Sequence, residues 1–106
     1  MKDCAAQAEK VGPGEAAVNK GNYDNHYSPK YDRCYVRISW TISQGEPVSG
    51  LGVRLIDAFE HSTIAVSTIT SPESKANCFV ESTDRQLIKV VDCSAAAAFI
   101  YDHMSN

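Results

Sequence analysis

The chain has 106 residues, of which 43% are hydrophobic and 22% charged, and its formal net charge at pH 7 is −3. This length fits one domain with a single hydrophobic core, residues 1–106, and the composition argues against intrinsic disorder. Acidic and basic residues are interspersed, so no basic face for nucleic acid is expected. The longest unbroken apolar stretch, Ala95–Tyr101, is far shorter than the roughly 20 residues that span a bilayer.

A helix is expected first, within residues 3–20. Asp3 is a favourable N-cap, and the apolar residues of the first turns share one face. Gly12-Pro13-Gly14 predicts that the continuous helix ends at Val11, because glycine frees the backbone and proline cannot donate a hydrogen bond. Residues 15–20 are then expected to add one more helical turn.

About five antiparallel strands are expected within residues 34–92. The clearest is Cys34–Ile42, in which apolar residues alternate with polar ones, as in a half-buried strand. A hairpin with its tip at residues 60–62 follows, and a second hairpin is expected to join Asn77–Glu81 to Leu87–Val91.

A second helix is expected over residues 94–104. Ser94 can cap it, and its apolar residues recur at helical spacing. His103 in the last turn suits the negative end of the helix dipole. Helices at both ends with strands between them predict an α+β fold, a sandwich with both helices on one face of the sheet.

The four cysteines are widely spaced, and none belongs to a C-x-x-C pair of the kind found in zinc and thioredoxin sites. An even number in a short chain indicates two disulfides, and the alternative is four reduced, buried thiols. Three connectivities are possible for four cysteines. The layout favours Cys78 with Cys93, which flank a hairpin, and Cys4 with Cys34.

Disulfides indicate an oxidising compartment. Met1-Lys2-Asp3-Cys4 lacks the apolar segment of a signal peptide, which has two interpretations. Either the protein is cytosolic, or a signal was removed and Met1 was added afterwards. The cysteines favour the second interpretation, a secreted or periplasmic protein.

Several short motifs resemble a group of small secreted bacterial proteins of uncharacterised function. They are Asn25-His26-Tyr27, followed after six residues by Cys34-Tyr35-Val36, then Asp57-Ala58-Phe59-Glu60, then Cys78 through Cys93 leading into the last helix. Cys4–Lys10 fits the same pattern. The resemblance implies export and disulfides. Gly12-Pro13-Gly14 departs from the pattern, in which the first helix would run on at this point. The resemblance assigns no activity.

Residues 22–33 are expected to form a polar, aromatic loop that is the best candidate for a binding surface, since tyrosine offers contact area at low entropic cost. The exposed face of the following strand, with Thr41, is expected to extend that surface. The alternative is that Tyr27 and Tyr31 anchor the loop on the sheet and His26 caps a turn. The candidate binding residues are Tyr23, His26, Tyr27, Tyr31, Tyr35 and Arg37.

No metal or cofactor is expected, because His26, His61 and His103 are far apart in the sequence and no metal-ligand motif is present. Hydrolase and phosphate-loop motifs are also absent. The sequence therefore favours a non-enzymatic module, monomeric or weakly dimeric, that binds a protein or envelope component. The alternative is a small hydrolase or metal-dependent enzyme centred on His26.

Overall fold

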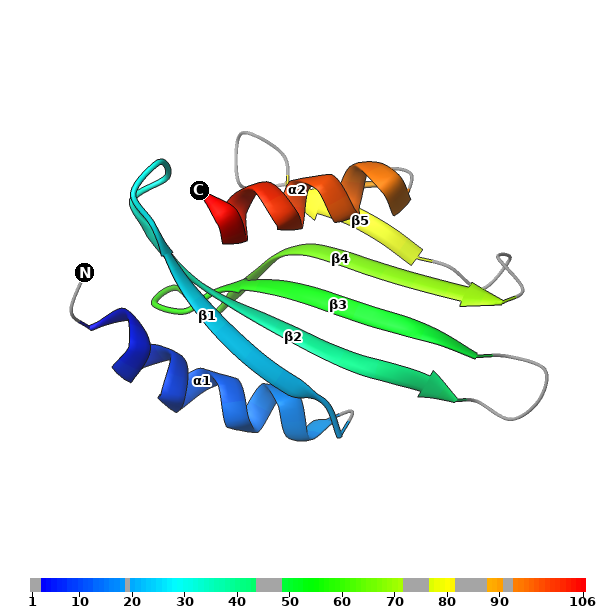
Figure 1. Ribbon diagram of the computed structural model, residues 1–106, viewed down its shortest axis with the longest axis horizontal. Coiled ribbons are helices and arrows are strands. Elements are labelled where there is room, and N and C mark those ends of the chain that lie inside the picture. Colours follow the sequence, from blue (N-terminus) through cyan, green and yellow to red (C-terminus); the bar gives the residue numbers. More distant parts are fainter. Residues whose placement is uncertain (1–2, 19, 44–48, 72–76, 82–87, 91–92) are drawn as a thin grey trace.

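The computed structural model describes residues 3–18, 20–43, 49–71, 77–81, 88–90 and 93–106. These residues form two helices and a six-stranded antiparallel sheet, in which every strand pairs with its neighbours in the sequence (Figure 1). The elements are α1 (Cys4–Val18), β1 (Asn22–Ser28), β2 (Arg33–Ser43), β3 (Ser49–Asp57), β4 (Ser62–Ser71), β5 (Asn77–Glu81), β6 (Ile88–Val90) and α2 (Cys93–Ser105). The α+β prediction with a helix at each end is confirmed.

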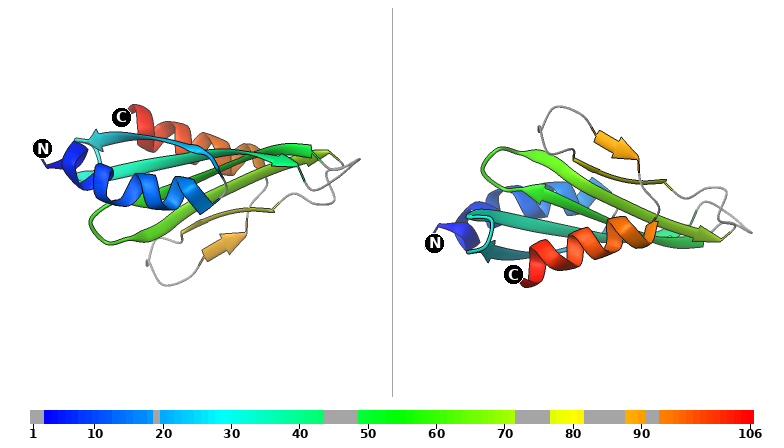
Figure 2. Two further views of the ribbon diagram at one scale, coloured as in Figure 1. Left: turned by 90° about the horizontal axis from the view of Figure 1, so that it is seen from below. Right: turned by 90° about the horizontal axis from the view of Figure 1, so that it is seen from above.

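The two helices cover opposite faces of the sheet, so the expectation that both lie on one face is wrong. Figure 2 shows α1 in front of the strands in one view and α2 in front in the opposite view. Alternation along β2 is the cause, because successive side chains point to opposite faces. Val36 and Ile38 pack in a core with α1, whereas Tyr35 packs in a second core with Ile100 of α2.

The segment expected as a loop at residues 22–33 is mostly a strand, β1, and only residues 29–32 remain as a turn. Strand β1 brings the sheet of the described residues to six strands, above the expected five. Each residue of β1 pairs in register with β2, from Asn22 opposite Ser39 to Ser28 opposite Arg33. The segment has no apolar alternation, so its strand conformation comes from β2 and from packing beneath the helices.

Helix α1 runs through Gly12-Pro13-Gly14 without a break, so the expected end at Val11 is wrong. Proline removes one backbone hydrogen bond, and tertiary contacts on both sides of it hold the helix. Cys4 is bonded to Cys34 before the proline, and Glu15 lies 2.8 Å from Arg54 of β3 after it. Gly12 is needed for close packing, because a Cβ there would lie 2.4 Å from the ring of Tyr23.

The favoured disulfide pairing is confirmed, with Cys4 bonded to Cys34 and Cys78 to Cys93. The first hairpin is also confirmed, as β3 and β4 joined by a turn. In the second hairpin β5 pairs with β6, while Leu87 and Val91 lie outside the described residues. No helix in the described part of the chain has the length and apolarity needed to cross a membrane.

Candidate functional site

The six candidate binding residues do not form one surface. Tyr23 and Tyr27 of β1 pack against the α1 core. The cross-strand partners His26 and Tyr35 lie on the other face, which α2 covers. The candidate residues therefore lie in two separate environments, and the expected continuous binding loop is not present.

Tyr27 and Tyr31 act as anchors at this end of the molecule. The Tyr27 hydroxyl donates a hydrogen bond to Asp32, which raises the pKa of Tyr27. The Tyr31 hydroxyl donates to Asp102 of α2, which lies far away in the sequence. Both bonds hold the turn between β1 and β2, where Asp32 takes a left-handed φ of 51°.

Tyr35 is 4% exposed, so the expectation that it belongs to an exposed strand face is wrong. It contacts the edge of the His103 ring, at 5.4 Å between centroids. His103 itself is stacked between Tyr31 and Phe99, with centroids 4.0 and 3.9 Å away. This aromatic cluster fixes the end of α2 on the sheet.

Charge around the cluster is balanced by Asp102. Its carboxylate accepts hydrogen bonds from the Tyr31 hydroxyl and from Lys30 Nζ, and these bonds lower the pKa of Asp102. Burial lowers the pKa of His103, and its Nδ1 lies 2.7 Å from the Phe99 carbonyl oxygen. A neutral His103 that donates from Nδ1 to this carbonyl fits these surroundings.

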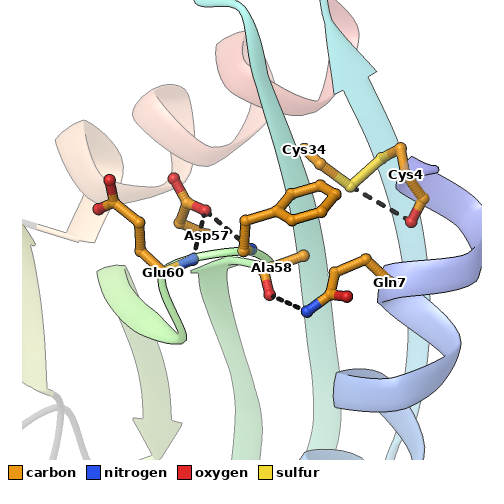
Figure 3. The surroundings of a disulfide bond; sticks show 7 residues. Cys4, Gln7, Cys34, Asp57, Ala58 and Glu60 are labelled. Atoms are coloured by element: carbon orange, nitrogen blue, oxygen red, sulfur yellow. Dashed lines mark hydrogen bonds between the residues drawn. A yellow bond between two sulfur atoms is a disulfide. The ribbon is translucent and has the colours of Figure 1, made fainter. Parts of the chain in front are cut away.

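Several of the short motifs quoted above lie close together, and Figure 3 shows Cys4, Gln7, Cys34 and the turn at Asp57–Glu60 around the first disulfide. Asn25-His26-Tyr27 lies directly opposite Cys34-Tyr35-Val36. In the turn after β3, Ala58 donates its N–H to the Cys34 carbonyl and accepts a hydrogen bond from Gln7 of α1. The Asp57 carboxylate accepts hydrogen bonds from the backbone N–H groups of Phe59 and Glu60. The arrangement gives these motifs an architectural role.

A groove lies on the α2 face of the sheet. Its volume is about 310 Å³, and it lies between α2 and strands β2, β3 and β4. The lining residues are Arg37, Ser39, Leu51, Val53, Ser67, Ala97, Ile100 and Tyr101. The groove is therefore apolar along β3 and α2, with small hydroxyls on β2 and β4.

Small side chains leave this space open. Ser39 and Ser67 stand where most neighbouring strand positions carry larger residues, and Ala97 of α2 lines the groove beside them. At the rim, Leu51 is 53% exposed and Tyr101 is 71% exposed. Two large apolar side chains next to an open groove are typical of an interaction site.

Arg37 is the candidate binding residue that lines the groove. Its guanidinium is held by Asp24 of β1, with Nε 3.0 Å from Oδ1 and the second contact at 2.5 Å. This bidentate geometry fixes the planar group in one orientation. Because Asp24 balances the charge of Arg37, the groove favours an apolar ligand over a strongly charged one.

Sequence reasoning missed most groove residues, among them Leu51, Val53, Ser67 and Tyr101. The sequence did contain a sign of small side chains: serines stand within strands that are rich in β-branched residues, and residues 95–98 are all alanine. Small residues in both segments leave space only where the segments face each other. The strand register and the helix position decide that, and neither can be seen in the sequence.

The histidines of the candidate enzyme site lie in different elements. His26 is on β1 and His103 on α2, while His61 occupies a left-handed position in the turn before β4, with φ 54°. Among the described residues, no three His, Cys, Asp or Glu side chains are grouped so that they could hold a metal ion.

The chain matches no protein-family model, no curated protein and no solved structure.

Proposed function

We propose that this protein is a secreted or periplasmic binding module that holds an apolar side chain of a protein partner in the α2 groove. The observation that carries the proposal is the groove of about 310 Å³ with exposed Leu51 and Tyr101 at its rim. Both disulfides support export, because disulfides persist in oxidising compartments.

The size and chemistry of the groove favour a protein partner. Its volume is at the lower limit of small-molecule sites, which start at about 300 Å³. One large aliphatic or aromatic side chain fits such a space, and interface anchors are commonly of this kind. The Tyr101 ring at the rim adds contact area, and its hydroxyl can bind the partner's backbone.

The test fills the groove without touching the rest of the fold. Ala97→Phe places a ring inside the groove, and Ala98→Phe adds the same ring on an exposed position that does not line it. Peptides selected from a displayed random library on the wild-type protein serve as the probe, and calorimetry measures their affinity for each variant.

We expect selected peptides to share a large apolar residue and to bind Ala97→Phe about tenfold more weakly or worse, the loss of roughly one buried anchor. Ala98→Phe should bind them as the wild type does. Equal affinity for the two variants, or selected peptides without a shared apolar residue, would contradict the proposal.

A further inference from the structure

Strand β1 is an edge of the sheet, with β2 as its only neighbour in the described part of the chain. Both helices contact β1, and Figure 2 shows α1 and α2 on opposite sides of this part of the sheet. Such edges are usually blunted by lysine, proline or a bulge. The sequence of β1 contains neither residue, and its register with β2 is unbroken.

The direction of the backbone groups along β1 follows from its neighbours. The Cys34 carbonyl accepts a hydrogen bond from Ala58, so the backbone of Cys34 faces away from β1. Tyr27, the β1 partner of Cys34, must then direct its N–H and carbonyl to the outer edge, and Asn25 and Tyr23 do the same by alternation. At Gly21 the outward N–H is already taken, because it donates to Ala16 of α1.

We propose that β1 pairs antiparallel with β1 of a second copy, with Asn25 opposite Asn25. The strand reads Asn-Tyr-Asp-Asn-His-Tyr-Ser, which is nearly symmetric about its centre. In this register Tyr23 faces Tyr27 of the second copy, and Asp24 faces His26. The outward groups of Tyr23, Asn25 and Tyr27 all become hydrogen-bonded pairs, and the two sheets join into one.

A second copy is the partner that fits this edge. A two-fold interface brings the same patch together from both subunits, so the patch must complement itself. The Asp24 side chain is 50% exposed and acidic, and it comes beside the imidazole of His26 on the same face. On the other face, two tyrosine pairs meet.

This inference is independent of the groove, and sedimentation equilibrium of the purified, oxidised protein tests it. We expect the wild type to form a dimer of twice the monomer mass. Asn25→Pro removes an outward N–H that β2 does not use, and proline is tolerated on an edge strand. Two hydrogen bonds are lost across the axis, so dimerisation should weaken about tenfold or more.

A cross-linking pair keeps the test decisive if Asn25→Pro fails to fold. Residues opposite each other in a hydrogen-bonded antiparallel pair have Cα atoms about 5.5 Å apart, within the range of a disulfide. Asn25→Cys should therefore give a covalent dimer on air oxidation, whereas Asn22→Cys, an exposed residue of the same strand, should not. A wild type that stays monomeric at millimolar concentration, a dimer unaffected by Asn25→Pro, or equal cross-linking of both cysteine variants would overturn the proposal.

Discussion

The two faces of the sheet are packed in different ways. On the α1 face large rings are matched to glycines, with Tyr23 lying over Gly12 and Trp40 over Gly52, where an added Cβ would lie 2.4 and 2.2 Å from the rings. On the α2 face small side chains are matched to small ones, and the groove remains between them.

The comparison shows how one sheet can provide both stability and a surface for interaction. Where a ring meets a glycine, the space is filled and the helix is fixed close to the sheet. Where Ala97 faces the serines of β2 and β4 the space stays open, and the helix is held by the buried Ile100 and by contacts at its two ends. The Cys78–Cys93 disulfide secures its start, and the cluster around His103 secures its last turn.

Removal of the disulfides should give the largest losses of stability on the two faces. Cys4–Cys34 spans 30 residues and Cys78–Cys93 spans 15, so chain entropy assigns them about 3.6 and about 3 kcal/mol. Both cysteines of the first bond are buried in the α1 core, so replacing them with alanine also leaves a cavity.

Urea unfolding of the two double-alanine variants measures this difference. We expect the loss of the first disulfide to lower the free energy of unfolding more than the loss of the second. A larger loss from removal of Cys78–Cys93 would show that the α2 face contributes more to stability than its open packing indicates.

Two glycines of the same helix sharpen the comparison at a smaller scale. Gly12→Ala places a methyl group against the Tyr23 ring, whereas no atom lies within 4 Å of a Cβ at Gly14. Alanine normally stabilises a helix by about 0.5–1 kcal/mol relative to glycine. We expect Gly14→Ala to show that gain, and Gly12→Ala to lose about 1–3 kcal/mol by overpacking.

Thermal denaturation of both variants checks the expected opposite signs. Equal gains would mean that Tyr23 moves aside without cost, and the α1 face would then be less tightly packed than the structure shows.

The smallest expected effect concerns pH and the α2 face. Burial holds the pKa of His103 below its ordinary value, so the unfolded chain binds more protons as pH falls through about 6.5. Stability should therefore decrease as pH falls from 7 towards 5. His103→Phe keeps a ring between Tyr31 and Phe99 but cannot titrate.

The melting temperatures of the wild type and His103→Phe, followed from pH 7 to 5, test this effect. The wild type should lose more than the variant over that range, since other titrating groups are common to both. Parallel curves would show that His103 keeps an ordinary pKa in the folded protein.

The strand prediction succeeded where side-chain alternation was strong and failed where tertiary contacts supplied the stability. Cys34–Ile42 was found because its apolar residues alternate, and it lies within β2. Asn22–Ser28 has no such pattern, so it was assigned to a loop. Its strand conformation depends on pairing with β2 and on bonds such as Asp24 to Arg37.

The candidate site shows the same division. Arg37 could be identified because a charged residue within a strand is visible in the sequence. The structure places it on the lining of the groove. The rim residues Leu51 and Tyr101 were not identified, since an apolar residue is expected to be buried and only the packed structure shows it exposed.

The sequence by itself determined the terminal helices, the main strands and the favoured disulfide pairing, because these follow from local periodicity, capping and the nearness of cysteines along a hairpin. Only the tertiary structure decided that the helices lie on opposite faces, that α1 continues through Pro13, and that Ala97 faces small residues across a groove. Those features depend on register and on contacts between distant segments, which local patterns do not encode.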